Sequence, residues 1–290
     1  MLRAVGSVED PPAGSPTADE ESEEFPVWQA VALGVLHGPA ELLPISSSGH
    51  IAVVPWLAGW QYCRLDDELR KSCEVALHTG TAAALLISLR REVEDAVRGL
   101  SLRRVWQIGL SFAPPAFMGY RYERWIERHL GTPPTVAAGL FAGAVAMALA
   151  DRAPQERRAE DARTADALWL GVAQACSLIP GVSRNGATLA AARRRRFTRV
   201  DANRLSRHAA LPIIAGATVL KGVRLRARGL PPDAAVPFAA GALAAFVSTL
   251  GSTRLIQALE RDSSLLPYAL YRIGLAALIA RRLASAHDRD

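Results

Sequence analysis

The stretch HGPAELLPISSSGH, residues 37–50, places a carboxylate, three consecutive hydroxyls, a glycine and two histidines between two apolar segments. It belongs to a longer pattern that occurs twice. LGVLHGPAELLPISSSG begins at Leu33, and LGVAQACSLIPGVSRNG begins at Leu170. The copies are offset by 137 residues at Leu33 and Leu170 and by 136 residues at Pro44 and Pro180. Internal duplication of a polar loop is therefore the feature from which the fold can be predicted.

Each copy of the pattern is followed by three apolar segments. An odd number of membrane crossings per half inverts the second half relative to the first, which predicts an inverted-topology repeat with two re-entrant segments. Polar backbone is tolerated at membrane depth only where protein buries it or water reaches it. We therefore expect the two polar loops to enter from opposite faces and to line one chamber.

The composition supports a membrane protein. Half of the 290 residues are apolar, and the charged residues, 21% of the chain, are clustered rather than spread. Apolar segments that approach the ~20 residues needed for a span lie at about 27–45, 73–89, 105–120, 135–150, 166–182, 208–223, 235–256 and 265–283. We predict an all-α polytopic membrane protein with about six full transmembrane helices and two re-entrant segments. A soluble Ala-rich helical bundle is the alternative.

The chain is predicted to hold one folded domain. Residues 1–25 are rich in Pro, Gly, Ser and acidic residues, which is typical of a disordered acidic tail. Residues 26–285 form a single membrane domain, with repeat one at about 27–150 and repeat two at about 166–283. The three cysteines have neither metal-ligand spacing nor the even number that a disulfide framework requires.

Arginine is distributed unequally between the connectors. Segments 90–104, 151–165 and 193–207 carry 5, 4 and 7 arginines, whereas 120–134 and 224–234 carry three each. The positive-inside rule places the first group on the cytoplasmic side and both termini outside. The net charge of +6 thus fits membrane flanks, and without interleaved aromatic residues it does not indicate nucleic-acid binding.

The second polar stretch, PGVSRNGAT at 180–188, has the chemistry of an anion site. Arg184 offers a planar fork of donors that suits phosphate oxygens. Neighbouring residues can complete an anion-binding site around it with hydroxyl, amide and backbone N–H groups. These residues are Ser183, Asn185, Gly186 and Thr188. A solvated turn with a helix cap is the alternative for such a short motif.

The first polar stretch supplies acid–base and nucleophilic groups. Glu41 can take a proton or bind a metal ion, and His50 can activate a hydroxyl or a water molecule. Ser46, Ser47 and Ser48 are candidate nucleophiles or phosphate ligands, although a plain N-cap is the alternative, for Ser48 in particular. His37 lies four residues before Glu41 and shares its helix face, as either a metal ligand or a packed side chain. Together the two stretches predict hydrolysis of a phosphate ester or anhydride that carries a lipid tail.

Three motifs, ELLPISSSGH, EVALHTGT and PGVSRNGAT, resemble in order and spacing the bacterial undecaprenyl-diphosphate phosphatase (bacitracin-resistance) family. ANRLSRHAALPIIAGA and LLPYALYRIGLAAL are also similar to its later segments, so the resemblance runs from about Trp28 to Arg282. It implies a multi-pass plasma-membrane hydrolase that removes one phosphate from undecaprenyl diphosphate and recycles the lipid carrier for peptidoglycan synthesis. It also implies dependence on a divalent cation, Mg²⁺ or Ca²⁺.

By motif, Glu41 matches the second acid of the family's Glu-Gly-x-x-Glu element, Ser47 its nucleophilic or phosphate-binding serine and His50 its histidine. Ser183 and Arg184 match the second motif. The resemblance thus implies Glu41, Ser47, His50 and Arg184 as catalytic residues.

The chain departs from the family pattern at three places. His37 replaces the usual first Glu, Asn185 replaces a Ser, and an arginine run, 193–196, replaces a more apolar stretch. The change at His37 predicts that Glu41 and His37 form a cation site with a weaker preference for Mg²⁺. The three departures together indicate a divergent member of the family.

Other activities of the same chamber remain open from the sequence. A polyprenyl-phosphate flippase that uses Glu41 and His50 as a proton relay is one alternative, and an inactive lipid-binding relative is another. The attacking group is either Ser47, through a phosphoserine, or a water molecule. A homodimer is also a candidate state.

Overall fold

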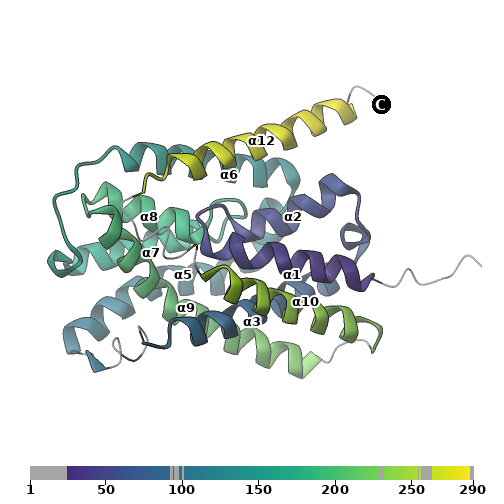
Figure 1. The fold of residues 1–290 in the computed structure, drawn as a ribbon, viewed down its shortest axis with the longest axis horizontal. Coiled ribbons are helices and arrows are strands. Elements are labelled where there is room, and N and C mark those ends of the chain that lie inside the picture. Colours follow the sequence, from purple (N-terminus) through teal and green to yellow (C-terminus); the bar gives the residue numbers. More distant parts are fainter. Residues whose placement is uncertain are drawn as a thin grey trace, which may run out of the picture.

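The computed structural model describes residues 25–287, except for 92–93, 95–97, 100, 229–231, 254 and 256–262. Within this part of the chain it is all-helical, and its only β-type pairing is an isolated bridge between Arg157 and Phe197. The long helices run roughly lengthwise through the molecule (Figure 1). The predicted tail at 1–24 lies outside the described residues, but Phe25, which was assigned to that tail, is buried in the core.

The helices of the described residues fall into two series of five. The first is α1 (Val27–Leu42), α2 (Ser47–Ala58), α3 (Asp67–Ser88), α5 (Leu102–Leu130) and α6 (Pro133–Asp151), with a short 3₁₀ helix at Gln61–Arg64. The second is α7 (Thr164–Cys176), α8 (Arg184–Arg194), α9 (Arg199–Arg228), α10 (Pro232–Gly251) and α12 (Leu266–His287), preceded by a 3₁₀ turn at Ala159–Asp161. Parts of the predicted connectors are helical, since α5 continues to Leu130 and α9 begins at Arg199.

Each series opens with a helical hairpin that returns to the end of the molecule from which it started. Trp28 at the start of α1 contacts Trp60 just after α2, with ring centroids 5.2 Å apart. Asp166 at the start of α7 accepts a 2.7 Å bond from Arg195 just after α8. The two hairpins start at opposite ends of the molecule (Figure 1), and their tips meet in the interior, where Arg184 pairs with Glu41.

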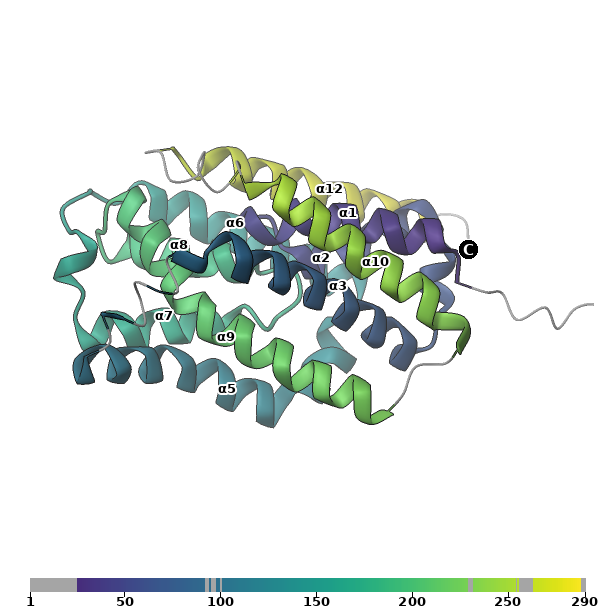
Figure 2. The same cartoon turned by 60° about the horizontal axis from the view of Figure 1, so that its bottom comes forward.

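Small residues bring the hairpins close to their neighbours. A Cβ added at Gly34 of α1 would overlap the backbone of α10 at Gly241. At Gly171 of α7 it would lie 2.8 Å from Leu110 O of α5. Such close approach is typical of helix packing in membranes. In both ribbon views α1 lies along α10, and α6 lies along α12 (Figures 1 and 2).

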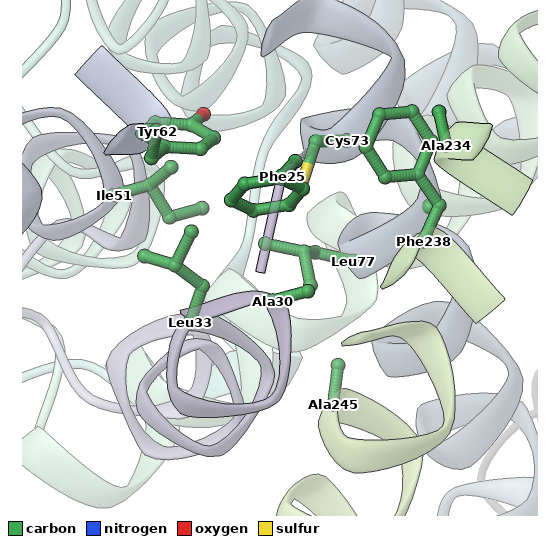
Figure 3. Close-up of a cluster of buried hydrophobic side chains, with 11 residues drawn as sticks. Phe25, Ala30, Leu33, Ile51, Tyr62, Cys73, Leu77, Ala234, Phe238 and Ala245 are labelled. Carbon is green, nitrogen blue, oxygen red and sulfur yellow. The ribbon is translucent and has the colours of Figure 1, made fainter. Parts of the chain in front are cut away.

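One end of the molecule is closed by an apolar cluster. Phe25, Tyr62 and Phe238 meet there, with Cys73 and Leu77 of α3 beside them (Figure 3). The Phe25 and Tyr62 ring centroids are 6.0 Å apart. This packing holds the start of α1 against α3 and α10. It therefore fixes the direction in which the α1–α2 hairpin runs toward the interior of the molecule.

The opposite end is held by ionic contacts among the arginine-rich connectors. Arg103 donates to Ala162 O at 3.0 Å, and Arg204 pairs with Glu160 at 3.0 Å. Arg193, 1% exposed, donates to the backbone carbonyls of Ala153 and Phe197. Arg193 of the arginine run, which departs from the family pattern, therefore anchors the base of the second hairpin.

Two helices in the described part of the chain have both the length and the apolar composition of a membrane span, α6 and Asp233–Gly251 of α10. The sequence predicted about six. Helices α3, α5, α9 and α12 are 22 to 30 residues long, but they include charged residues such as the DELRK that begins α3. Large side chains on outer faces are apolar and exposed, among them Phe141 and Leu149 on α6, Leu243 and Val247 on α10, and Leu270 on α12.

Candidate active site at the meeting hairpin tips

The two hairpin tips share an unusual backbone conformation. Ser46 and Ser183 are the N-caps of α2 and α8, with φ of 77° and 65°, a region that non-glycine residues rarely occupy. Their hydroxyls accept backbone N–H bonds from Gly49 at 3.3 Å and Gly186 at 3.2 Å. The N-cap of the first tip is thus Ser46, whereas Ser48, the residue for which a cap was the main alternative, is exposed.

Glu41, Ser47 and Arg184 form one connected cluster at the tips. Arg184 of α8 makes an ion pair with Glu41 Oε1 of α1. The Ser47 hydroxyl donates to Glu41 Oε2 at 2.5 Å. The Glu41 and Arg184 side chains are 12% and 21% exposed, so the pair is shielded but reachable. Because charge-assisted bonds strengthen where water is scarce, the cluster joins the hairpins electrostatically.

His50 lies in the same loop but has different partners. Its Nδ1 is 2.7 Å from Ser46 O, and its Nε2 is 2.7 Å from the Tyr271 hydroxyl of α12. A carbonyl only accepts, so Nδ1 carries the proton and Nε2 of the neutral ring accepts from Tyr271. From the sequence we expected His50 to activate the Ser47 hydroxyl. In the structure that hydroxyl donates to Glu41 instead.

A cavity opens beside the cluster. Its polar lining residues are Glu41, Arg184, Asn185, Thr188, Asn203, Ser206 and Arg207, and its apolar lining residues are Leu42, Leu85, Leu89, Ala210 and Ile214. Among the described residues, Arg184 Nη1 is buried without a hydrogen-bond partner. A donor in that state next to an amphipathic cavity suits an anionic headgroup with an apolar tail.

The predicted substrate-binding residues divide into two groups. Asn185 and Thr188 line the cavity, where Asn185 donates to Leu42 O at 2.8 Å and Thr188 lies 2.6 Å from the Ser206 hydroxyl. The polar groups of Ser46 and Ser183 serve as caps, and the Gly186 N–H is used by the second cap. A substrate contact for Ser46, Ser48, Ser183 and Gly186 stays a prediction.

A group of potential metal ligands lies next to the cluster. His37, Glu41 and His78 each present a ligand atom, and these atoms lie within 4.8 Å of one another. His37 is fully buried, and its ring meets that of His78 edge-on at 4.5 Å. Two imidazoles and a carboxylate this close fit one divalent cation. His78 was not identified from the sequence, although an ionisable residue in the apolar part of α3 is the signal that marks functional sites in membranes.

Arg272 of α12 is the second residue that the sequence did not single out. It is fully buried, and its guanidinium donates to Gly181 O at 2.8 Å, Val182 O at 2.9 Å, Gly139 O at 3.4 Å and Pro44 O at 3.4 Å. It therefore bridges both hairpin tips. A lone arginine within the apolar LLPYALYRIGLAAL segment was the available signal.

Comparison with known proteins shows the protein family of this chain. The family model described as bacitracin resistance protein BacA matches residues 30–278. The chain belongs to the BacA family. It is 37% identical over 260 residues to an undecaprenyl-diphosphatase of Geobacter sulfurreducens, covering 85% of this chain and 94% of that protein.

Other relatives agree. The chain is 36% identical over 259 residues to an undecaprenyl-diphosphatase of Pelobacter propionicus, covering 84% and 92% of the two chains. It is 35% identical over 270 residues to one of Rubrobacter xylanophilus, covering 88% and 97%. The BacA match includes both hairpins and extends into α12, so it spans every residue of the cluster described above.

Proposed function

We propose that this chain hydrolyses undecaprenyl diphosphate to undecaprenyl phosphate and inorganic phosphate, and so recycles the lipid carrier for peptidoglycan synthesis. The observation that carries the proposal is the Glu41–Ser47–Arg184 cluster beside a cavity that has both polar and apolar lining residues. It occurs in a chain of the BacA family whose relatives named above are undecaprenyl-diphosphatases. The polar lining residues suit the diphosphate, and the apolar lining residues suit the first part of the polyprenyl tail.

Arg184 holds the diphosphate in this proposal. Its Nη1 has no hydrogen-bond partner among the described residues, and phosphate oxygens would join or replace Glu41 as partners of its fork. The released Glu41 carboxylate would then be basic enough to take the Ser47 proton along the existing 2.5 Å bond. Substrate binding thus prepares the base and the nucleophile together.

The reaction breaks the bond between the terminal phosphorus and the bridging oxygen. Ser47 Oγ forms the new bond to that phosphorus while Glu41 takes the serine proton, and undecaprenyl phosphate leaves with the electron pair and receives that proton from Glu41. Water then releases inorganic phosphate from Ser47, with Glu41 taking the proton of the water and returning one to Ser47. In the alternative path Glu41 deprotonates a water that attacks directly, and Ser47 orients it.

A divalent cation completes the proposed site. His37, Glu41 and His78 would hold it, and when bound it would neutralise charge on the diphosphate oxygens. His50 and Arg272 act differently, because they contact the loop backbone and keep the tips in place.

We place the chain in the bacterial plasma membrane as a multi-pass protein with two re-entrant hairpins and an inverted repeat. The support is the reciprocal packing in which α1 lies against α10 and α7 lies against α5. The arginine-rich connectors that contact one another at one end would face the cytoplasm. A homodimer stays a prediction that native mass spectrometry in detergent would check.

The test is phosphate release from undecaprenyl diphosphate by the purified protein in detergent, with EDTA and with added Mg²⁺, Ca²⁺, Mn²⁺ or Zn²⁺. Release that is lost in the Glu41→Gln variant is the expected result. A folded native protein that binds the lipid but releases no phosphate under any of these conditions would overturn the proposal. Movement of the intact polyprenyl phosphate across vesicles would then favour the flippase.

A further inference from the structure

His37, Glu41 and His78 form a ligand set in which nitrogen outnumbers oxygen, and we propose that it is a site for a borderline transition-metal ion such as Zn²⁺, not for Mg²⁺ or Ca²⁺. The inference deepens the proposed function and rests on it for the use of the metal. It concerns two histidines, of which His78 was not identified from the sequence. The site follows from three contacts in this chain.

The first contact orients His78. Its Nδ1 lies 2.8 Å from Glu74 O in the preceding turn of α3. Because a carbonyl only accepts, Nδ1 carries the proton and the ring lone pair is on Nε2. A histidine that donates its other N–H to a backbone carbonyl is the usual arrangement of a metal ligand, since it fixes both the tautomer and the ring orientation.

The second contact holds the His37 ring in place. Its Nδ1 lies 2.7 Å from the hydroxyl of Thr81, a buried residue one turn after His78 on α3. A hydroxyl can accept as well as donate, so Thr81 can take the Nδ1 proton and leave the lone pair of His37 on Nε2 for a metal ion. One helix, α3, thus supplies both a ligand and the group that orients a ligand on α1.

The contacts of Glu41 limit the negative charge that the site offers to a cation. Glu41 is the only carboxylate among the three ligands, and it is already shared by Arg184 and Ser47. Mg²⁺ and Ca²⁺ are bound through several hard oxygens, usually with more than one carboxylate. One compensated carboxylate attracts them weakly, whereas imidazole nitrogen bonds strengthen from Mn²⁺ toward Cu²⁺ and Zn²⁺ in the general order of divalent affinities.

The geometry also leaves room for the substrate. Three protein ligands with at least one open position are typical of catalytic zinc sites, whereas structural sites are closed by four. Glu41 links the three ligands to Arg184, where diphosphate oxygens would arrive. Because all three ligands come from the protein, metal binding can be measured without turnover.

Metal binding by the apo protein in detergent tests the proposal. Equilibrium dialysis with elemental analysis should find one Zn²⁺ per chain, bound at least ten-fold more tightly than Mg²⁺ by competition. His78→Gln should weaken Zn²⁺ binding at least ten-fold. The matched control is His129→Gln, an exposed histidine at the end of α5, which should bind as the native protein does. Co²⁺ should give visible ligand-field bands in the native protein that change in His78→Gln and persist in His129→Gln.

A second variant keeps the test decisive if His78→Gln does not fold. His37→Glu keeps a ligand one turn from Glu41 but changes nitrogen to oxygen, and it should shift the preference toward Mg²⁺ by about ten-fold. Equal Mg²⁺ and Zn²⁺ affinity in the native protein, or unchanged competition in His37→Glu, would overturn the inference. Zn²⁺ bound as expected without any phosphate release would instead overturn the proposed function and leave the metal site standing.

Discussion

Glu41 and Arg184 are 143 residues apart in the chain and form an ion pair between the tips of the two hairpins. The pair joins an acid from the first hairpin to a cation from the second, so neither hairpin holds the site alone. It also explains the polar stretch at residues 37–50, which lies in the interior because its partner loop neutralises it there. An intact site therefore requires both hairpins in one folded chain.

Arg184→Ala should lower kcat at least 100-fold, because removal of one positioned charge donor typically costs ~10²–10³ in rate. Arg184→Lys should recover little, since an ammonium keeps the charge but lacks the planar fork. Phosphate release is the measurement, and Arg194→Lys, an exposed residue of the same helix, is the control. A near-native rate in the Arg184→Lys variant would show that charge alone is enough.

Ser47→Ala separates the two attacking groups. If Ser47 is the nucleophile, the Ser47→Ala variant should show no turnover. Acid quench of this variant with terminally labelled substrate should then trap no phosphorylated enzyme. A residual rate near one-hundredth of native would instead identify water as the attacking group, because the variant then loses only an orienting hydrogen bond. Ser285→Ala at the exposed end of α12 should behave as the native protein.

Arg272→Met should destabilise the protein and nearly abolish turnover. The change leaves the buried carbonyls of Gly181 and Val182 without their donor, and each such bond to a charged group is worth about 1.5–3 kcal/mol. Thermal unfolding in detergent should show a lower Tm than in Arg281→Met, an exposed neighbour on the same helix. Arg272→Lys should recover part of the Tm but little activity, because one ammonium cannot reach both tips. Equal Tm values for Arg272→Met and Arg281→Met would contradict the bridging role.

Cysteine labelling should report the orientation in the membrane. In a background without Cys63, Cys73 and Cys176, an impermeant reagent added outside whole cells should label a cysteine at 125 and spare one at 158. Both native side chains are exposed at their ends of the bundle. The sequence also predicts outside labelling at 229, which is beyond the described residues, and protection at 98. The reverse pattern would invert the membrane orientation while leaving the fold unchanged.

The fold class could be predicted because its signals are local. Apolar segments of sufficient length, small residues at close spacing and a duplicated loop all lie within short stretches of chain, and the helical fold is confirmed in this coarse form. The predicted count of about six spans is not reached on this criterion. Among the described residues, two helices have the length and apolar composition of a membrane span. The others carry charges whose position relative to lipid depends on how the helices pack.

The sequence by itself determined the chemical inventory: Glu41, Ser47 and Arg184 could be chosen because carboxylate, hydroxyl and guanidinium groups in two equivalent loops have few other uses in an apolar setting. Only the tertiary structure decided the partners. It assigned Ser47 to Glu41 and His50 to Tyr271, and it brought His78 and Arg272 to the site from α3 and α12. The reason is physical, because a hydrogen bond or a ligand contact depends on distances of a few ångströms between helices far apart in sequence. Those distances are set by packing at glycines such as Gly34, and no local pattern encodes them.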